Sequence, residues 1–337
     1  MNVAAPAGTT DLRQHAEALA DLGRMAPSLH NAQPWAFRVG SDRVDVLLDR
    51  SRLLPVADPT GRQAHLGLGA AVFLLRLGLS ALDCESTVEP WPEAQDPATV
   101  ARLSVRGRRP PTPAERRLLA AVPARRTVRT PFVPEDVPVP LRVAWREAVE
   151  LAGAGLRWVE RPGERIGVAA LVAVAERMQQ RDAAYLAELD RWTALTMVAE
   201  GAGVPPSAYG VTAAAGHAAE FPLRDFAGGR QTDRPRHVGP AEEHPVVAVL
   251  ETAGDQPEDW LAGGQALMRV LLTAAADGYA ASYLNQPLEL PGLRRQLRDE
   301  LRLTGWPQLV LRLGRPAGVL PPQAPRRPIA DVLLPPR

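Results

Sequence analysis

A short segment near the N-terminus gathers polar residues that could bind a ligand. Residues 26–35 read APSLHNAQPW, so one hydroxyl, one imidazole and two amides lie between two prolines. Recognition of the edge of a heteroaromatic ring requires such donors and acceptors, and the prolines restrict the shape of the loop. The same residues could equally form a capping turn with no ligand, and the pattern alone leaves both interpretations open.

Two arginine clusters could hold an anion. Residues 125–132 read RRTVRTPF, and a second pair, Arg326-Arg327, stands between prolines near the C-terminus. Guanidinium groups bind phosphate through paired N–H contacts, and a hydroxyl adds a further donor. All 39 cationic side chains of the chain are arginine, so any bound phosphate must be held by arginine, hydroxyls or backbone N–H groups. Taken alone, each cluster could also be a solvated charged surface.

Composition and missing motifs exclude several classes of protein. The 39 basic and 38 acidic residues give a net charge of +1, which argues against a dedicated nucleic-acid binder. The absence of lysine rules out Schiff-base and P-loop lysines. Cys84 stands alone, so neither an internal disulfide nor a cysteine zinc site can form. The six histidines lack ligand spacing, and the serine-hydrolase and zinc-protease motifs are missing.

The apolar stretches favour a soluble chain. Residues 1–10 show no basic region and no apolar core of a secretory signal. The longest apolar stretch, residues 66–82, is interrupted by Arg76 and is marginal for a membrane span. We therefore expect a buried core helix there, and a cytoplasmic protein without a membrane partner.

Periodicity predicts alternating helices and strands. Apolar spacing predicts helices over residues 11–25, 66–82, 141–151, 165–192, 261–277 and 293–303. Alternation predicts a hairpin over 36–48 and strands over 100–105, 246–250 and 308–313, with a proline- and arginine-rich link at 106–113. This mixture predicts an α+β fold with antiparallel-rich sheets flanked by helices.

The length and a faint internal repeat suggest two halves. At 337 residues the chain fits one large unit or two coupled halves. Gly69, Ala71 and Ala81 align with Gly264, Ala266 and Ala276, which could arise by chance or from a fused pseudo-dimer. We place the halves at residues 1–112 and 113–337. Residues 201–239 have weak periodicity, which is typical of a lid or a flexible loop.

Together the clusters resemble the flavin site of the nitroreductase superfamily, and the whole chain is similar to its Acg-like branch, which carries two nitroreductase-type halves in one polypeptide. Residues 28–35, SLHNAQPW, resemble the P-S-x-x-N-x-Q-P-W loop of the superfamily. Residues 125–132 resemble its R-R-S-x-R-x-F motif, with Thr127 in place of serine. The LNQP and GWPQ segments at 284–287 and 305–308 resemble its C-terminal part, and Arg326-Arg327 its closing basic pair.

The resemblance implies an FMN site with contributions from both halves. One half would supply the residues along the ring and ribityl chain, Pro27, Ser28, Leu29 and Asn31. The phosphate would be held by Arg125, Thr127, Arg326 and Arg327, with Arg126 in the same motif. Arg129 would lie near the pyrimidine edge, and the backbone of Asn285 and Gln286 near the flavin N5. The superfamily uses no obligatory protein acid or base, so no catalytic side chain is assigned.

The implied function is an FMN-dependent oxidoreductase. Hydride would pass from NAD(P)H through FMN to a small nitroaromatic, quinone or unsaturated acceptor. One complete site per chain and a monomer are expected, since the internal pseudo-dimer replaces a second subunit. If residues of the 201–239 segment (Tyr209, His217, Phe221 or Phe226) stack over the ring, nicotinamide cannot reach it, and the protein would store flavin instead. A structural module with no cofactor is a third possibility.

Overall fold

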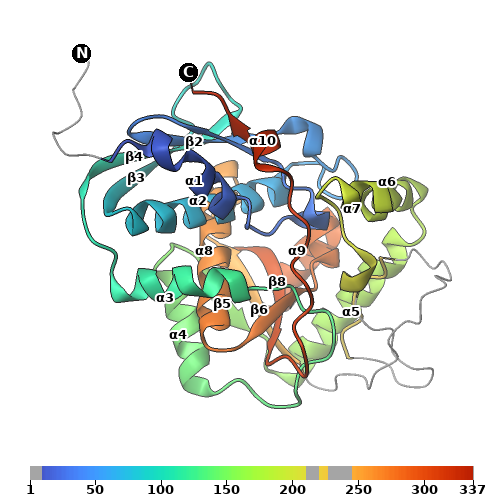
Figure 1. The fold of residues 1–337 in the computed structure, drawn as a ribbon. Coiled ribbons are helices and arrows are strands. Elements are labelled where there is room, and N and C mark those ends of the chain that lie inside the picture. The colour runs from blue at the N-terminus through green and yellow to red at the C-terminus, as the bar shows by residue number, and fades with distance from the viewer. Residues whose placement is uncertain (1–9, 210–219, 227–244, 337) are drawn as a thin grey trace.

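The computed structural model describes residues 10–209, 220–226 and 245–336, which form two β-sheets (Figure 1). The first sheet has the strand order β3-β4-β2-β1-β9 and the second the order β5-β6-β8-β7. All pairings are antiparallel except that of β9 with β1. The strands are β1 (Trp35–Val39), β2 (Arg43–Leu48), β3 (Cys84–Pro90), β4 (Thr99–Arg108), β5 (Gly155–Trp158), β6 (Val246–Thr252), β7 (Ala280–Tyr283), β8 (Trp306–Gly314) and β9 (Leu333–Leu334).

Two long helices join the sheets. Helix α2 (Arg62–Ala81) packs in the core of the first sheet and α8 (Pro257–Ala276) in the core of the second. The helices cross at Gly69 and Gly264, where a Cβ on either glycine would lie 2.0 Å from a carbonyl oxygen of the other helix. Helix α2 is long and apolar enough to cross a membrane, but 83% of its apolar window is buried. It is therefore the buried core helix that the sequence predicts.

The other helices cover the sheets and the connections between them. They are α1 (Ala16–Gly23), α3 (Pro113–Ala121), α4 (Val139–Glu150), α5 (Pro162–Gln179), α6 (Ala183–Thr193), α7 (Leu195–Ala199), α9 (Pro291–Glu300) and α10 (Ile329–Val332). Short 3-10 turns occur at Leu12–His15, Leu29–Asn31, Arg50–Arg52, Val122–Ala124, Pro206–Ala208 and Gln286–Glu289. The α+β prediction is confirmed.

Some predicted elements differ from those observed. The helix predicted over 165–192 is two helices, α5 and α6, because Asp182 caps the backbone N–H groups of Ala184 and Tyr185 and starts a new helix. The predicted link at 106–113 begins inside β4, which continues to Arg108. Strands β3, β5 and β7 and helix α3 have no counterpart in the sequence prediction.

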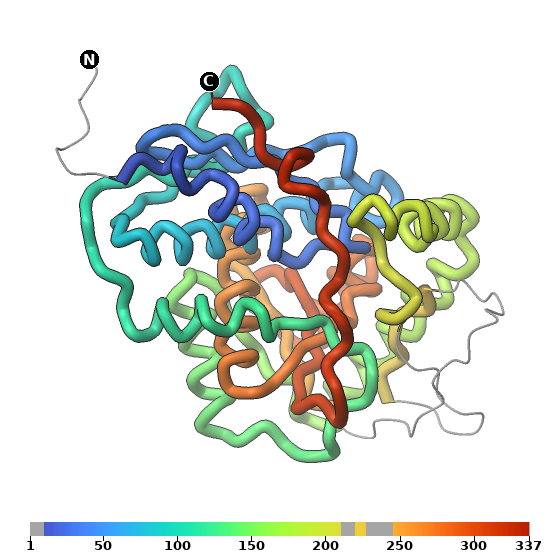
Figure 2. The backbone as a smooth tube through the Cα atoms, in the orientation of Figure 1, coloured from blue at the N-terminus to red at the C-terminus, as the bar shows by residue number. Residues whose placement is uncertain are grey.

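The C-terminal segment returns to the first sheet. Residues 315–328, called the C-terminal strap below, leave β8 of the second sheet and lead to β9, which pairs with β1 through Phe37 and Leu333. Figure 2 shows this strap in red, running across the molecule from one sheet to the other. Apart from β9, the strands of the first sheet lie between residues 35 and 108 and those of the second between residues 155 and 314, so the division of the chain at residue 112 stays a prediction. The pseudo-dimer origin of the two halves stays a prediction.

Candidate functional site

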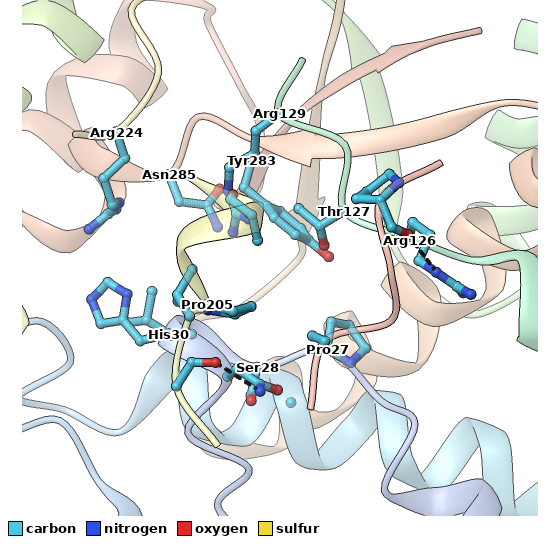
Figure 3. Close-up of a pocket in the computed structure, with 18 of the residues that line it drawn as sticks. Pro27, Ser28, His30, Arg126, Thr127, Arg129, Pro205, Arg224, Tyr283 and Asn285 are labelled. Carbon is cyan, nitrogen blue, oxygen red and sulfur yellow. Dashed lines mark hydrogen bonds between the residues drawn. The ribbon is translucent and has the colours of Figure 1, made fainter. Parts of the chain in front are cut away.

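One cavity brings most of the predicted site residues together. Its volume is about 140 Å³, and its walls come from the 25–31 loop, α2, the 125–129 segment, residues 203–208 and 223–226, the end of β7 and the C-terminal strap. Ten of the twelve predicted residues line it: Pro27, Ser28, Leu29, Asn31, Arg125, Arg126, Thr127, Arg129, Asn285 and Arg326. Figure 3 shows Arg126 and Thr127 at one end, and His30 and Arg224 at the other.

The 25–31 loop has an unusual and firmly held backbone. His30, Asn31 and Gln33 have φ values of 49°, 54° and 55°, a left-handed conformation that costs about 1–3 kcal/mol for each non-glycine residue. The Ser28 hydroxyl accepts a hydrogen bond from the backbone N–H of Gln33 at 2.9 Å. Ser28 makes no side-chain cap at the turn that follows it. The Ser28 side chain therefore holds the loop through Gln33 and does not cap the turn at Leu29–Asn31.

Asn31 connects three parts of the cavity wall. Its Nδ2 donates to the carbonyl oxygens of Gly203 and Pro325 at 3.0 and 2.9 Å, and its Oδ1 accepts from Arg326 Nη1 at 2.9 Å. The loop, the 203–208 segment and the C-terminal strap are thus joined through one amide. This network explains how the loop keeps its strained backbone.

The 125–129 segment lies along the edge of the second sheet. Thr127 forms a bridge with Ala281 of β7, and the Val128 N–H donates to the Ala281 oxygen at 3.0 Å. Because side chains alternate along an extended segment, Val128 is buried in the protein while Thr127 and Arg129 line the cavity.

Four arginines of the cavity, Arg125, Arg126, Arg129 and Arg326, form no ion pair with an acidic side chain among the described residues. Arg125 donates to the Met25 oxygen, Arg129 to the Ala208 oxygen, and Arg126 to the Pro321 oxygen. Arg326 donates to Asn31 and to backbone carbonyls. No aspartate or glutamate occurs among the described residues of the wall. Burial without a counter-ion is unfavourable for a cation, so the site is suited to an anionic ligand.

The pKa values reflect the same imbalance. Burial, together with the neighbouring arginines, lowers the pKa of Arg326 to about 9. Burial and the charge of Arg224 lower the pKa of Arg129 to about 10. Burial also lowers the pKa of Arg125. A bound anion would favour the charged form of each group and reverse these shifts.

Several buried polar atoms of the wall have no hydrogen-bond partner in the part of the chain that the structure describes. They include the Tyr283 hydroxyl, Arg326 Nε and His30 Nε2. Leaving such an atom unpaired costs about 1–3 kcal/mol, so unpaired atoms beside one cavity point to a missing ligand. Burial raises the pKa of Tyr283, which keeps its hydroxyl neutral and able to donate. The arginines and unpaired donors fit a ligand that carries a phosphate and further acceptors, as FMN does.

Tyr283 and Arg224 are among the wall residues that the sequence prediction missed. Tyr283 ends β7, two residues before Asn285, and the motif at 284–287 could have pointed to it. Arg224 gives no signal in the sequence, because the surrounding segment has no periodicity. Its Nη2 forms a buried ion pair with Glu289 Oε1 at 2.6 Å, and Glu289 also accepts from Gln179 at 2.7 Å.

The aromatic residues of the 201–239 segment lie in different places. Phe226 lines the cavity, and its ring stacks on Tyr209 with centroids 5.7 Å apart. The Arg129 guanidinium lies 4.7 Å from the centre of the Phe226 ring. Phe221 packs in a separate apolar cluster with Val159 and Leu284. His217 lies outside the described residues.

Two predicted site residues do not line the cavity. Gln286 is fully buried, and its Nε2 donates to Glu176 at 3.3 Å. Arg327 donates to the Asp49 carboxylate and the Gln33 oxygen, both at 3.2 Å, and so ties the C-terminal strap to the first half. The side chains of Arg326 and Arg327 point in different directions, because neighbouring side chains of an extended chain project to opposite sides. The predicted basic pair thus contributes one arginine to the cavity.

Comparison with known proteins places the chain in a family. It is 32% identical over 327 residues to "Putative NAD(P)H nitroreductase acg" of Mycobacterium tuberculosis, covering 96% of each chain. It is 32% identical over 320 residues to "Putative NAD(P)H nitroreductase Rv3131" of the same organism, covering 93% of this chain and 89% of the relative. A search of family models gave no match. The chain belongs to the nitroreductase superfamily, in its Acg-like branch.

Solved structures show a more distant likeness. A nitroreductase with bound FMN from Bacteroides fragilis is 16% identical, with a TM-score of 0.36, over 60% of this chain and 90% of that chain. A nitroreductase-like protein from Bacillus cereus is 13% identical, also with a TM-score of 0.36, over 64% of this chain and 92% of that chain.

Proposed function

We propose that this chain is an FMN-binding oxidoreductase of nitroreductase type, which passes hydride from NAD(P)H through FMN to a small nitroaromatic, quinone or unsaturated acceptor. Membership of the Acg-like branch supports the class of reaction. The observation that carries the cofactor assignment is the cavity itself, in which four arginines gather without a described acidic partner.

The arginine end of the cavity would hold the ribityl phosphate. Arg125, Arg126 and Arg326 line this wall together with the Thr127 hydroxyl. A phosphate monoester carries a charge of about −2, and each hydrogen bond from a charged donor contributes roughly 1.5–3 kcal/mol. This anion would replace the missing counter-ions of the buried guanidinium groups.

The remaining wall would orient the ring. Bound FMN supplies the hydride-relay chemistry, and the protein supplies orientation and charge. Arg129 would stabilise negative charge on the reduced ring, since no described carboxylate competes for its guanidinium. Asn31 and Asn285 would bound the ring from the two halves of the chain. We expect one FMN per chain and a monomeric, cytoplasmic protein.

A flavin-storage protein is the second candidate. The Phe226 ring lines the cavity and contacts both the Tyr209 ring and the Arg129 guanidinium. Such a stack would keep nicotinamide from a ring beneath it. Both candidates require FMN, and they differ only in whether a reductant can reach it.

FMN binding is tested by reconstitution. Purified protein is mixed with FMN, freed of excess, and its flavin content is measured by absorbance. The double variant Arg125→Ala/Arg326→Ala should lose nearly all bound flavin. Arg146→Ala is the control: it removes an exposed arginine of α4, and the variant should keep its bound flavin. Colourless wild-type protein would exclude both candidates.

Turnover is tested by anaerobic reduction. Flavoprotein is mixed with NADH or NADPH, and the flavin absorbance is followed with time. Bleaching by either donor supports the oxidoreductase. Stable oxidised flavin with both donors, combined with bleaching by dithionite, would favour storage.

A further inference from the structure

The end of the cavity away from Arg126 and Thr127 has its own chemistry. Figure 3 shows His30, Arg224 and Pro205 in its described wall. Phe226 also lines the cavity and contacts the His30 ring. Among the described residues, no acidic side chain lies on this wall, and Glu289, the partner of Arg224, is not part of it. A cationic ligand would therefore meet only positive charge, whereas an oxygen with partial or full negative charge would be attracted.

The charges at this end are fixed in position. Arg224 is held by Glu289 at 2.6 Å and by the Tyr185 hydroxyl. Glu289 is held in turn by Gln179 and by Gln63, which also lines the cavity. Such a network resists rearrangement, so Arg224 keeps its place when a ligand enters.

His30 offers an unsatisfied polar atom at this end. Its side chain is 5% exposed, and its Nε2 has no hydrogen-bond partner among the described residues. Burial, with the charges of Arg224 and Arg129, lowers the pKa of the imidazole well below its usual value. The ring is therefore neutral near pH 7, and a neutral imidazole has one N–H to donate.

Flat groups shape the space around His30. The edge of its ring meets Phe226 at a centroid distance of 6.0 Å and an angle of 84°. Phe226 is itself stacked against Tyr209 and the planar Arg129 guanidinium. A planar ligand that moved Phe226 aside could stack in the same place and uncover His30 Nε2.

We propose that this end of the cavity receives the electron acceptor, which is a flat, uncharged or anionic molecule whose oxygen accepts a hydrogen bond from His30. This inference rests on the proposed function, and it names the substrate class of the same site. His30 is thus a specificity-determining residue that contacts the substrate. Cationic acceptors of the same shape bind more weakly.

Binding without turnover tests the proposal. Oxidised FMN-loaded protein, with no nicotinamide present, is titrated with para-nitrobenzoate, para-nitrobenzamide and the cationic para-nitrobenzamidine, whose substituents are all planar, and the change in flavin absorbance gives each Kd. These probes share the nitroaromatic ring and differ in charge. The cationic probe should bind at least about tenfold more weakly than the other two.

Variants of His30 test the hydrogen bond. His30→Leu should raise the Kd of para-nitrobenzamide roughly 3- to 10-fold, which corresponds to the loss of one neutral hydrogen bond. His30→Gln, which keeps a donor, should recover most of the affinity. His15→Leu is the matched control, since His15 lies in the 3-10 turn Leu12–His15 and not in the cavity wall. The FMN Kd of each variant is measured in parallel.

The outcomes separate this inference from the proposed function. If FMN content is normal and the acceptor Kd values depend neither on the charge of the probe nor on the residue at position 30, the proposed oxidoreductase function stands but the inference is overturned. Normal FMN content with no acceptor binding would overturn it and favour storage. Wild-type protein that takes up no FMN would overturn both. If His30→Leu weakens the binding of FMN and of the acceptor equally, His30 contacts the cofactor instead of the acceptor, and the inference is overturned.

Discussion

Gly69 of α2 and Gly264 of α8 meet where the two helices cross, and a methyl group on either would lie 2.0 Å from a backbone oxygen, that of Leu261 or of Leu66. No side-chain movement can relieve such a contact, because both obstructing atoms belong to helical backbones. The crossing also places Leu66 and Gly67 of α2 and Leu267 of α8 in the cavity wall. The separation of the two helices therefore sets the width of the site.

Gly69→Ala should destabilise the fold strongly. Overpacking in a core typically costs 1–3 kcal/mol, and we expect about 3 kcal/mol here because backbone opposes backbone. Thermal unfolding followed by circular dichroism measures the change. Gly163→Ala, in α5, is the control, since a Cβ there meets nothing within 4 Å. Equal melting temperatures for the two variants would show that the helices can separate without cost.

Asn31 and Arg326 should behave as one unit. Arg326 Nη1 donates to Asn31 Oδ1 at 2.9 Å, so each alanine variant should lower the free energy of unfolding by about 1–3 kcal/mol. The loss of unfolding free energy in the double variant should be smaller than the sum of the two single losses by at least about 0.5 kcal/mol. Urea unfolding of the four proteins gives this coupling energy. As a control, the effects of Asn31→Ala and Arg146→Ala on the free energy of unfolding should add. If the effects of Asn31→Ala and Arg326→Ala also add, the Asn31 amide does not couple the 25–31 loop to the C-terminal strap.

The sequence predicted those elements and residues that local patterns determine. The periodicity of residues 66–82 predicted α2, and the resemblance of residues 28–35, 125–132 and 284–287 to nitroreductase motifs, with the basic pair at 326–327, implied ten residues that line one cavity. Arg224 could not be found in this way, since its partner Glu289 lies 65 residues further on. Strand β9 spans two residues and pairs with β1 near the other end of the chain, and so short a segment has no measurable period. Long-range pairing, rather than local propensity, decided both cases.

The neutral state of His30 should make stability depend on pH. The folded pKa lies below the ordinary value of 6.5 because of burial and the nearby cations Arg224 and Arg129. As pH falls below 6.5, the unfolded chain binds a proton that the folded chain rejects, so the fold loses up to about 1.4 kcal/mol per pH unit until the folded pKa is reached. Above that window the effect is absent.

The difference between wild type and His30→Gln isolates this effect from other titrating groups. Unfolding free energies of the flavin-free proteins are measured from pH 7.5 to pH 5, a range of about 2.5 units chosen to cross the ordinary histidine pKa. The wild type should lose stability relative to the variant as pH falls. Parallel curves would show that His30 accepts its proton as readily in the folded protein as in the unfolded chain.

Phe226→Ala should speed the reduction of bound flavin by nicotinamide. The ring fills the end of the cavity between Tyr209 and the Arg129 guanidinium, with centroid distances of 5.7 and 4.7 Å. Its removal opens that end, so we expect bleaching by NADH or NADPH to become about tenfold faster in a stopped-flow experiment. Flavin affinity should fall only a few-fold, because one cation–π contact of about 0.5–2 kcal/mol is lost. Phe221→Leu, a change in the separate cluster with Val159, should leave the rate unaltered. If Phe226→Ala and wild type are reduced at the same rate, the stack does not limit access, and the storage candidate loses the observation that favours it.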